Sequence, residues 1–378
     1  MSHQPVIWIY GNAEELAGSR AWIFTLRKEA RVLTLGPSQD QSTEVVLPEP
    51  DLAPALESCP PELRPAACVN LALEPPRNLD GLPCPVLGWG GGKGPDGELP
   101  VSPNQARQTL LAAAAGGWRP AWLEQVQVNL PLGELLETYR PLVAAYPLNL
   151  EVGIDHRALD HLDEDSLQEA TGLLEGRRVT VHLPFMDLVP GSEDPTVAAA
   201  ALGRLDKAAD WALALGAVQV VCHLGFHQWL HPDRPAFARR LAENLGPLVK
   251  RLAERDCALM LENTFEPDPE PLVRCRNLLS PFGEVGYCLD VGHALCFSTT
   301  PLKRWWAALA PHLGELHLHD NDGSGDQHLA CGQGAVDWEL LRRGLGELER
   351  RPIFTLEPHR EAHLWASLRG LERLWGEP

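Results

Sequence analysis

The feature that most constrains the fold is an alternation of short apolar runs with longer amphipathic ones, repeated from about Gln125 to the C-terminus. The short runs are rich in Val, Ile and Leu, which is typical of buried β-strands. The longer runs carry apolar residues at helical spacing, as in the predicted helices Val197–Leu215 and Pro235–Glu254. Strands that alternate with helices pair in parallel, so the pattern predicts an α/β fold.

Eight strands can be placed in this part of the chain. Eight strand–helix units in roughly 250 residues match the size of a (β/α)8 TIM barrel. A doubly wound open sheet is the alternative, but eight units favour closure. The strand candidates are Val126–Leu130, Leu148–Ile154, Val179–Phe185, Val218–Phe226, Ala258–Asn263, Val285–Val291, Glu315–Asp320 and Ile353–Glu357.

The residues before the barrel form a different region with shorter apolar runs and much proline. We interpret residues 1–118 as a small open α/β domain and assign residues 119–378 to the barrel. The sequence does not indicate what the first domain does. Its strand candidates are Val6–Tyr10, Arg31–Leu35, Thr43–Leu47, Ala67–Leu71 and Pro85–Gly88.

Charge and composition exclude several classes of partner. The formal net charge is -19, so the chain lacks the basic surface that dominates nucleic-acid affinity, and a small-molecule substrate is expected instead. No apolar run approaches the roughly 18 residues of a membrane helix, and no basic stretch precedes Val6, so neither a membrane span nor a secretory signal is expected. The nine cysteines form no Cys-x-x-Cys pair, which favours a reducing, cytoplasmic location.

Ionisable side chains stand where successive barrel strands end. Chemistry in such barrels is carried by these positions, and a charged group in an apolar strand needs a partner. Taken singly, each residue has a plainer explanation: His182 as a rim histidine, Glu262 in a salt bridge, or Asp290 as a helix cap. As a set, converging imidazoles and carboxylates indicate a divalent-metal site. The candidates are His182, His223, Glu262, Asp290, His293, His317, Asp326, His328 and Glu357.

These residues lie in motifs that resemble the xylose-isomerase-like TIM barrel superfamily. That superfamily includes AP endonuclease family 2, with the endonuclease IV type of phosphodiesterase, and the sugar-phosphate isomerases and epimerases. The resemblance runs from about Gln125 to the C-terminus and leaves the first domain out. The motifs are VHLPF (His182), VCHLGF (His223), LMLENT (Glu262), CLDVGH (Asp290, His293), LHLHD (His317), DQH (Asp326, His328) and TLEPH (Glu357).

The resemblance implies one of two chemistries. The isomerases and epimerases hold one divalent cation, and their ligands correspond to Glu262, Asp290, His317 and Glu357. In that case Glu262 and Glu357 are also the catalytic acid and base. The endonuclease IV type adds five ligands, and residues of the right type stand at all five positions here: His182, His223, His293, Asp326 and His328.

The endonuclease type of site implies up to three cations in each chain. The first would be held by His182, His223 and Glu262, and the third by His293, Asp326 and His328. The second would be held by the four isomerase positions, with Glu262 bridging to the first. Zinc, manganese and iron all accept such mixed ligands. Three clustered cations suit hydrolysis of a phosphodiester, so we expect a metal-dependent phosphodiesterase, with an isomerase or epimerase as the alternative.

The substrate is expected to be a small phosphodiester and not DNA, because of the negative charge of the chain. The segments His182–Asp194 and His317–His328 are similar to a branch that contains cobamide-remodelling phosphodiesterases, so the nucleotide loop of a corrinoid is one candidate. His227 and His319 lie near the same rim and are predicted to contact the substrate or to orient ligands. A further alternative is a barrel without catalytic activity that serves as a binding module. The complete ligand set disfavours this alternative.

Overall fold

The structure of the protein is a computed structural model that describes residues 6–10, 30–36, 45–46, 67–71, 86–89, 126–140, 148–359 and 361–375, with some single positions between them. The chain separates into two compact units. The first comprises Met1–Pro120 with Thr138–Pro147, and the second comprises Ala121–Glu137 with Leu148–Pro378. The two units are described separately below.

The first unit contains a parallel sheet of five strands in the order β3-β2-β1-β4-β5. The central strand β1 pairs with β2 on one side and with β4 on the other. Its residues Ile7, Trp8 and Ile9 are buried, as expected of a central parallel strand covered on both faces. The predicted strands are thus present, although parts of the segments predicted at Thr43–Leu47 and Pro85–Gly88 lie outside the described residues. The bounds are β1 Val6–Tyr10, β2 Arg31–Gly36, β3 Val45–Val46, β4 Ala67–Asn70 and β5 Val86–Gly88.

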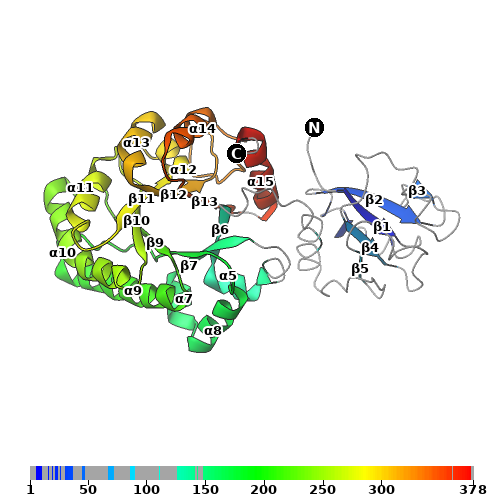
Figure 1. The fold of residues 1–378 in the computed structure, drawn as a ribbon, viewed down its shortest axis with the longest axis horizontal. Coiled ribbons are helices and arrows are strands. Elements are labelled where there is room, and N and C mark those ends of the chain that lie inside the picture. Colours follow the sequence, from blue (N-terminus) through cyan, green and yellow to red (C-terminus); the bar gives the residue numbers. More distant parts are fainter. Residues whose placement is uncertain are drawn as a thin grey trace. The chain divides into compact units, whose positions relative to one another are not determined.

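The second unit is a closed barrel of eight parallel strands, which confirms the predicted (β/α)8 architecture (Figure 1). Closure is made by the last and first strands, where Phe354 pairs with Val126. An open doubly wound sheet is therefore excluded. The strands are β6 Val126–Pro131, β7 Asn149–Gly153, β8 Val179–His182, β9 Gln219–His223, β10 Ala258–Glu262, β11 Val285–Asp290, β12 Leu313–Leu318 and β13 Ile353–Leu356.

Helices surround these strands on the outside of the barrel (Figure 1). Local signals fix where they begin: the side chain of Asp194 accepts a hydrogen bond from the main chain of Thr196 at the start of α9, and Asp233 does the same for Ala236 in α10. None of the described helices is long and apolar enough to cross a membrane. The helices are α5 Leu132–Glu137, α7 His156–His161, α8 Glu164–Leu173, α9 Pro195–Ala214, α10 Arg234–Ala253, α11 Glu270–Leu279, α12 Val291–Cys296, α13 Leu302–Leu309, a 3-10 turn Ala310–His312, α14 Trp338–Glu347 and α15 Glu361–Trp375.

Some strands are shorter than their apolar runs suggested. The strands predicted at Val179–Phe185 and Val218–Phe226 end at His182 and His223. Of the apolar residues beyond them, Leu183, Leu224 and Phe226 are buried, whereas Phe185 is 42% exposed. Both histidines consequently stand at the last position of their strands. The strand predicted at Glu315–Asp320 ends at Leu318, so His319 follows the strand directly.

A layer of polar side chains crosses the inside of the barrel below the strand ends. The amide Nε2 of Gln127 donates to Glu315 Oε1 over 2.8 Å and to Thr355 Oγ1 over 2.9 Å. The amide of Gln219 also donates to Glu315. Alternate residues of a barrel strand point inward, so Glu315 lies on the same face of β12 as His317. This polar layer therefore lies next to His317 inside the barrel.

Candidate metal centre

The ends of β8, β9 and β10 bring together a first group of ligand candidates. Nε2 of His182 and Nε2 of His223 each lie 3.0 Å from the same oxygen, Oε2 of Glu262. Nδ1 of His182 donates its proton to the main-chain oxygen of Leu183 over 2.8 Å. When the ring loses its other proton, this bond keeps the remaining proton on Nδ1 and leaves Nε2 free to bind a cation. The predicted first set of ligands is therefore assembled around one carboxylate oxygen.

The second group is centred on His317, which is fully buried. Its Nδ1 lies 3.1 Å from Oε1 of Glu357 and 3.4 Å from Oε1 of Glu262. Oδ2 of Asp290 lies 4.0 Å from the same nitrogen. Glu262 thus presents Oε2 to the first group and Oε1 to the second. This arrangement is the one that the predicted bridging role requires.

The other nitrogen of His317 faces carboxylates that sequence reasoning did not single out. Nε2 lies 3.2 Å from Oε1 of Glu151 and 3.8 Å from Oε1 of Glu315. Glu151 is fully buried, and its Oε1 accepts a hydrogen bond of 2.7 Å from Asn129. A carboxylate behind a ligand imidazole fixes the orientation of the ring. The available signal was a charged residue inside an apolar strand run, as in LNLEVGI for Glu151.

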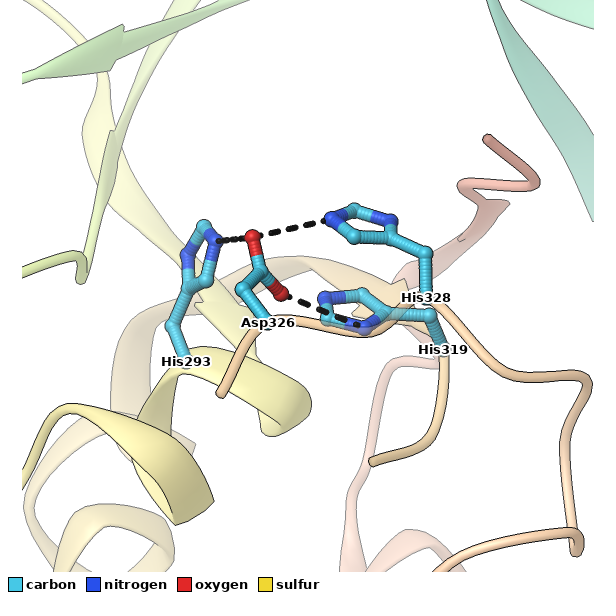
Figure 2. Close-up of side chains that lie close together, drawn as sticks. All are labelled: His293, His319, Asp326 and His328. Atoms are coloured by element: carbon cyan, nitrogen blue, oxygen red, sulfur yellow. Dashed lines mark hydrogen bonds and ion pairs between the residues drawn. The ribbon is translucent and has the colours of Figure 1, made fainter. Parts of the chain in front are cut away.

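The third group joins His293 to two residues of the loop after β12 (Figure 2). Oδ2 of Asp326 lies 3.5 Å from Nε2 of His293 and 3.1 Å from Nε2 of His328. Nδ1 of His293 donates to the main-chain oxygen of Asn263 over 3.0 Å, so its Nε2 is left as a ligand atom. His328 has a positive φ of 45°, an uncommon conformation for a non-glycine residue that is concentrated at functional sites.

The two histidines predicted to contact the substrate or to orient ligands occupy different surroundings. His319 is 1% exposed and lies with the third group, where its Nδ1 is 3.8 Å from Oδ1 of Asp326. His227 is half-buried on the loop after β9, and its backbone N–H donates to Nδ1 of His231 over 3.0 Å. The nine residues predicted as metal ligands therefore come together with His319, whereas His227 lies on a neighbouring loop.

The ends of β10 and β11 are tied together by Asn263. Its side chain accepts a hydrogen bond from the main-chain N–H of Asp290 and donates one to the main-chain oxygen of the same residue, both over 2.9 Å. Asp290 in turn caps α12, because its Oδ1 accepts from the main-chain N–H of His293 over 2.7 Å. Asp290 is thus both a helix cap and a member of the second group, and the cap fixes its carboxylate in place.

The groups shift one another's pKa values strongly. Burial, the largest influence, lowers the pKa of His182, but its hydrogen bond to Glu262 and the charge of that carboxylate raise the pKa to about 9. For Glu262 burial acts in the opposite direction, yet the nearby His223 and His317 hold the pKa well below its usual range. The carboxylate is therefore ionised and favours the cationic forms of His182 and His317, whereas burial lowers the pKa of His223. A divalent cation therefore has to displace protons from His182 and His317 when it binds.

The side chains of the centre fit such a cation. Within the described part of the chain, several buried polar atoms that face the three groups have no hydrogen-bond partner, among them Nδ1 of His317, Nδ1 of His319 and Oδ1 of Asp326. Buried polar atoms of this kind are normally satisfied, and a cation among them would do so. Imidazole nitrogens and carboxylate oxygens are ligands that zinc, manganese and iron accept.

The sequence and the fold of this barrel are similar to those of known proteins. A family model described as "Xylose isomerase-like TIM barrel" matches residues 150–374. The solved structure of TTHB071 protein from Thermus thermophilus, soaked with ZnCl2, is 35% identical with a TM-score of 0.58, covering 67% of this chain and 99% of that one. A "Probable endonuclease 4" of Symbiobacterium thermophilum is 26% identical over 196 residues, 46% of this chain and 69% of that protein.

A likeness in fold alone extends to sugar epimerases. The crystal structure of a D-tagatose 3-epimerase-like protein is 20% identical with a TM-score of 0.54, and the match covers 66% of this chain and 96% of that one. At this identity the likeness describes the barrel and not its chemistry. The side chains of the centre therefore have to decide between the two chemistries.

Proposed function

Because this chain belongs to the xylose isomerase-like TIM barrel family, whose model matches residues 150–374, we propose that it is a metal-dependent phosphodiesterase acting on a small molecule. One observation carries the proposal: the third group is assembled beside the other two. His293 and His328 both direct Nε2 to Oδ2 of Asp326. An isomerase does not need a third cation, although some isomerases retain several of these histidines for substrate contacts, whereas three clustered cations suit the hydrolysis of a phosphodiester.

Each of the three groups is proposed to bind one cation. Divalent cations bound there would stabilise the charge of the phosphate oxygens and make water a better nucleophile, so that no protein nucleophile is needed. Glu262 keeps the first and second groups adjacent through its two oxygens. Glu357 directs Oε1 to His317, and its side chain is 12% exposed. Its second oxygen, Oε2, is the proposed acceptor of the proton from the attacking water.

An apolar rim beside the centre supports a substrate with a large apolar part. The rim is formed by exposed side chains on the loops after β8, β9 and β10, with exposures from 42% for Phe185 to 80% for Trp229. Phe185 stacks on the ring of His223, with centroids 4.3 Å apart, so the rim reaches the first group. Apolar side chains beside converging polar groups are typical of small-molecule sites. The apolar rim consists of Phe185, Met186, Trp229, Leu230 and Phe265.

The substrate would therefore combine one phosphodiester with a bulky apolar group. His227 lies on the same loop as Trp229 and is proposed to contact this substrate. The net charge of -19 disfavours a long polyanion such as DNA. The nucleotide loop of a corrinoid joins a large ring to a single phosphodiester, and it is the first natural candidate to test.

The test measures metal content and turnover on the same preparation. Protein purified without chelator should contain about three equivalents of divalent metal and hydrolyse bis(4-nitrophenyl) phosphate. A chelator should abolish turnover, and Zn²⁺ or Mn²⁺ should restore it. His293→Ala and His328→Ala should each remove about one equivalent, whereas the exposed His156→Ala should remove none. Intact aryl phosphodiesters and cobamides after incubation with the metal-loaded protein would contradict the proposal.

An isomerase or epimerase is the second candidate, favoured by the two glutamates around His317. Glu262 and Glu357 each bring one oxygen within 3.4 Å of the same nitrogen. Two carboxylates at a single cation can exchange a proton beside a sugar carbonyl. This candidate predicts about one metal equivalent, insensitive to His293→Ala. It also predicts incorporation of deuterium into a ketose in heavy water, which a phosphodiesterase would not cause.

A further inference from the structure

His319 occupies a position between the second and third groups. It follows the end of β12 and is 1% exposed. Its Nε2 lies 3.1 Å from both carboxylate oxygens of Asp290. Its Nδ1 faces Asp326, with Oδ1 at 3.8 Å (Figure 2). One imidazole thus touches a carboxylate of each group.

The contacts of this ring decide which of its nitrogens carries the proton. Asp290 offers only acceptor oxygens when ionised, so Nε2 of His319 is the donor. In the neutral ring the lone pair is then on Nδ1. Within the described part of the chain, this Nδ1 is buried and has no hydrogen-bond partner. A buried lone pair directed at a cluster of metal-ligand candidates is what a further ligand atom would look like.

Two neighbours hold the ring in this orientation. The ring of His328 stacks on it, with centroids 3.8 Å apart and planes 8° apart. On another side lies Gly292, where an added Cβ would be 2.1 Å from Cε1 of His319. The main-chain oxygen of Gly292 accepts a hydrogen bond of 2.9 Å from Asn321, which keeps this backbone in place. Glycine is therefore the residue that leaves room for the ring.

We propose that His319 is a fourth protein ligand of the third cation, through Nδ1, beside His293, Asp326 and His328. Its Nε2–H holds the carboxylate of Asp290 at the same time, so His319 would connect the residues of the second and third groups. The inference rests on the proposed function, because it presupposes that the third group holds a metal. A cation with four protein donors is expected to be held more tightly than one with three.

Two substitutions separate the ligand role from the orienting role. In His319→Gln the amide nitrogen can reach the place of Nε2 and still donate a hydrogen bond to Asp290. No atom of glutamine takes the place of Nδ1 as a metal ligand. In His319→Asn the polar atom stands near Nδ1, and the contact with Asp290 is lost. We expect His319→Gln to keep two Zn²⁺ ions with wild-type affinity and to bind the third about 10–100-fold more weakly. The measurement is competition for Zn²⁺ with a chromophoric chelator.

A control variant tests whether ring stacking alone explains the result. His359 stacks on the other face of His328, with centroids 3.4 Å apart. In His359→Phe a ring remains while the imidazole is lost, so the affinity for the third Zn²⁺ should stay at the wild-type level. A loss in His359→Phe equal to that in His319→Gln would overturn the ligand role.

A measurement on the wild type does not depend on the folding of any variant. In protein labelled with ¹⁵N-histidine, zinc coordination shifts the resonance of the bound nitrogen. The proposal requires two rings bound through Nδ1, His317 and His319, whereas only His317 is expected without it. If the wild-type protein binds fewer than three Zn²⁺ ions, the proposed function itself is refuted. Two outcomes would refute only the role of His319: three bound Zn²⁺ ions with the His319 resonance unshifted, or three bound Zn²⁺ ions with wild-type affinity in His319→Gln.

Discussion

Nδ1 of His328 donates a hydrogen bond over 2.8 Å to the main-chain oxygen of Glu357. A residue of the third group is thereby positioned by the backbone of a residue of the second. The bond also fixes the tautomer of His328, whose Nε2 is left to face Asp326. Because the acceptor is a main-chain atom, substitution of the Glu357 side chain should leave this bond intact.

Glu357→Gln should therefore separate the second cation from the third. The substitution removes the charge that faces Nδ1 of His317 at 3.1 Å but preserves the shape of the side chain. We expect kcat to fall at least about 100-fold and the second cation to be lost, while the third cation is retained. Metal analysis and steady-state kinetics check this, with the exposed Glu243→Gln on α10 as the matched control. Loss of the third cation as well would show that the backbone bond does not preserve that group.

Glu262→Gln should have a wider effect, because both oxygens of Glu262 are used. Oε2 lies between His182 and His223, and Oε1 lies near His317. We expect the first and second cations to be lost, with turnover reduced by at least about 1,000-fold. Metal content per chain and hydrolysis of an aryl phosphodiester are the readouts. Activity near the wild-type level would mean that the centre described here does not perform the reaction.

Gly292→Ala should disturb the third group through a residue that is not itself a ligand. The new Cβ would meet Cε1 of His319 at 2.1 Å, so that ring has to move. We expect a loss of about 1–3 kcal/mol in the free energy of unfolding, together with weaker binding of the third cation. Urea denaturation of the metal-free protein gives the first quantity, and chelator competition gives the second.

A matched control for this change lies on α9. An added Cβ at the exposed Gly203 meets nothing within 4 Å. Gly203→Ala should therefore stabilise the helix by about 0.5–1 kcal/mol and leave metal binding unchanged. Equal effects of the two alanines would argue against the close approach of His319 to Gly292.

Substitutions in the apolar rim should change substrate affinity and not the chemical step. Trp229 is 80% exposed and is free to contact the apolar part of a substrate. Trp229→Ala should raise KM for bis(4-nitrophenyl) phosphate about tenfold and leave kcat within about twofold of wild type. The corresponding control is Leu278→Ala, since Leu278 is an exposed apolar residue on α11. If Trp229→Ala lowered kcat with KM constant, the rim would not be a binding surface for substrate.

Glu315 should make stability depend on pH. Burial, together with the charge of Glu151, raises the pKa of Glu315 from 4.5 to about 8. Between pH 4.5 and about 8 the folded state keeps the carboxyl proton of Glu315, whereas the unfolded state releases it. The resulting stabilisation is therefore complete below about pH 4.5 and is lost as the pH rises towards 8.

The variant Glu315→Gln is neutral at every pH, and the Gln219 amide can rotate to accept from it. Relative to wild type it should gain a few kcal/mol of unfolding free energy between about pH 5 and 8. Urea denaturation of the metal-free proteins across this range measures the difference, with the exposed Glu175→Gln as control. A difference that stays constant with pH would show that Glu315 is ionised throughout.

The sequence by itself determined the barrel and the set of ionisable residues at its strand ends, and the resemblance to the family implied their division into three groups. A period of two in the strands and of 3.6 in the helices follows from backbone geometry and is visible in a single sequence. Parallel strands in a closed barrel end at one rim, so residues at successive strand ends had to meet. This is why His182, His223 and Glu262, which are far apart in the chain, could be placed together without a structure.

Only the tertiary structure decided how these side chains are oriented. The contact of Glu151 with Nε2 of His317 depends on the register of strands that are distant in the chain. The bonds that leave Nε2 of His293 and His328 free use main-chain oxygens, which no residue type reveals. His319 is 1% exposed and lies against Gly292 just after the end of β12, a close approach that no residue type reveals. Such details follow from packing, which places atoms to within an ångström, whereas a sequence pattern specifies only the face of an element.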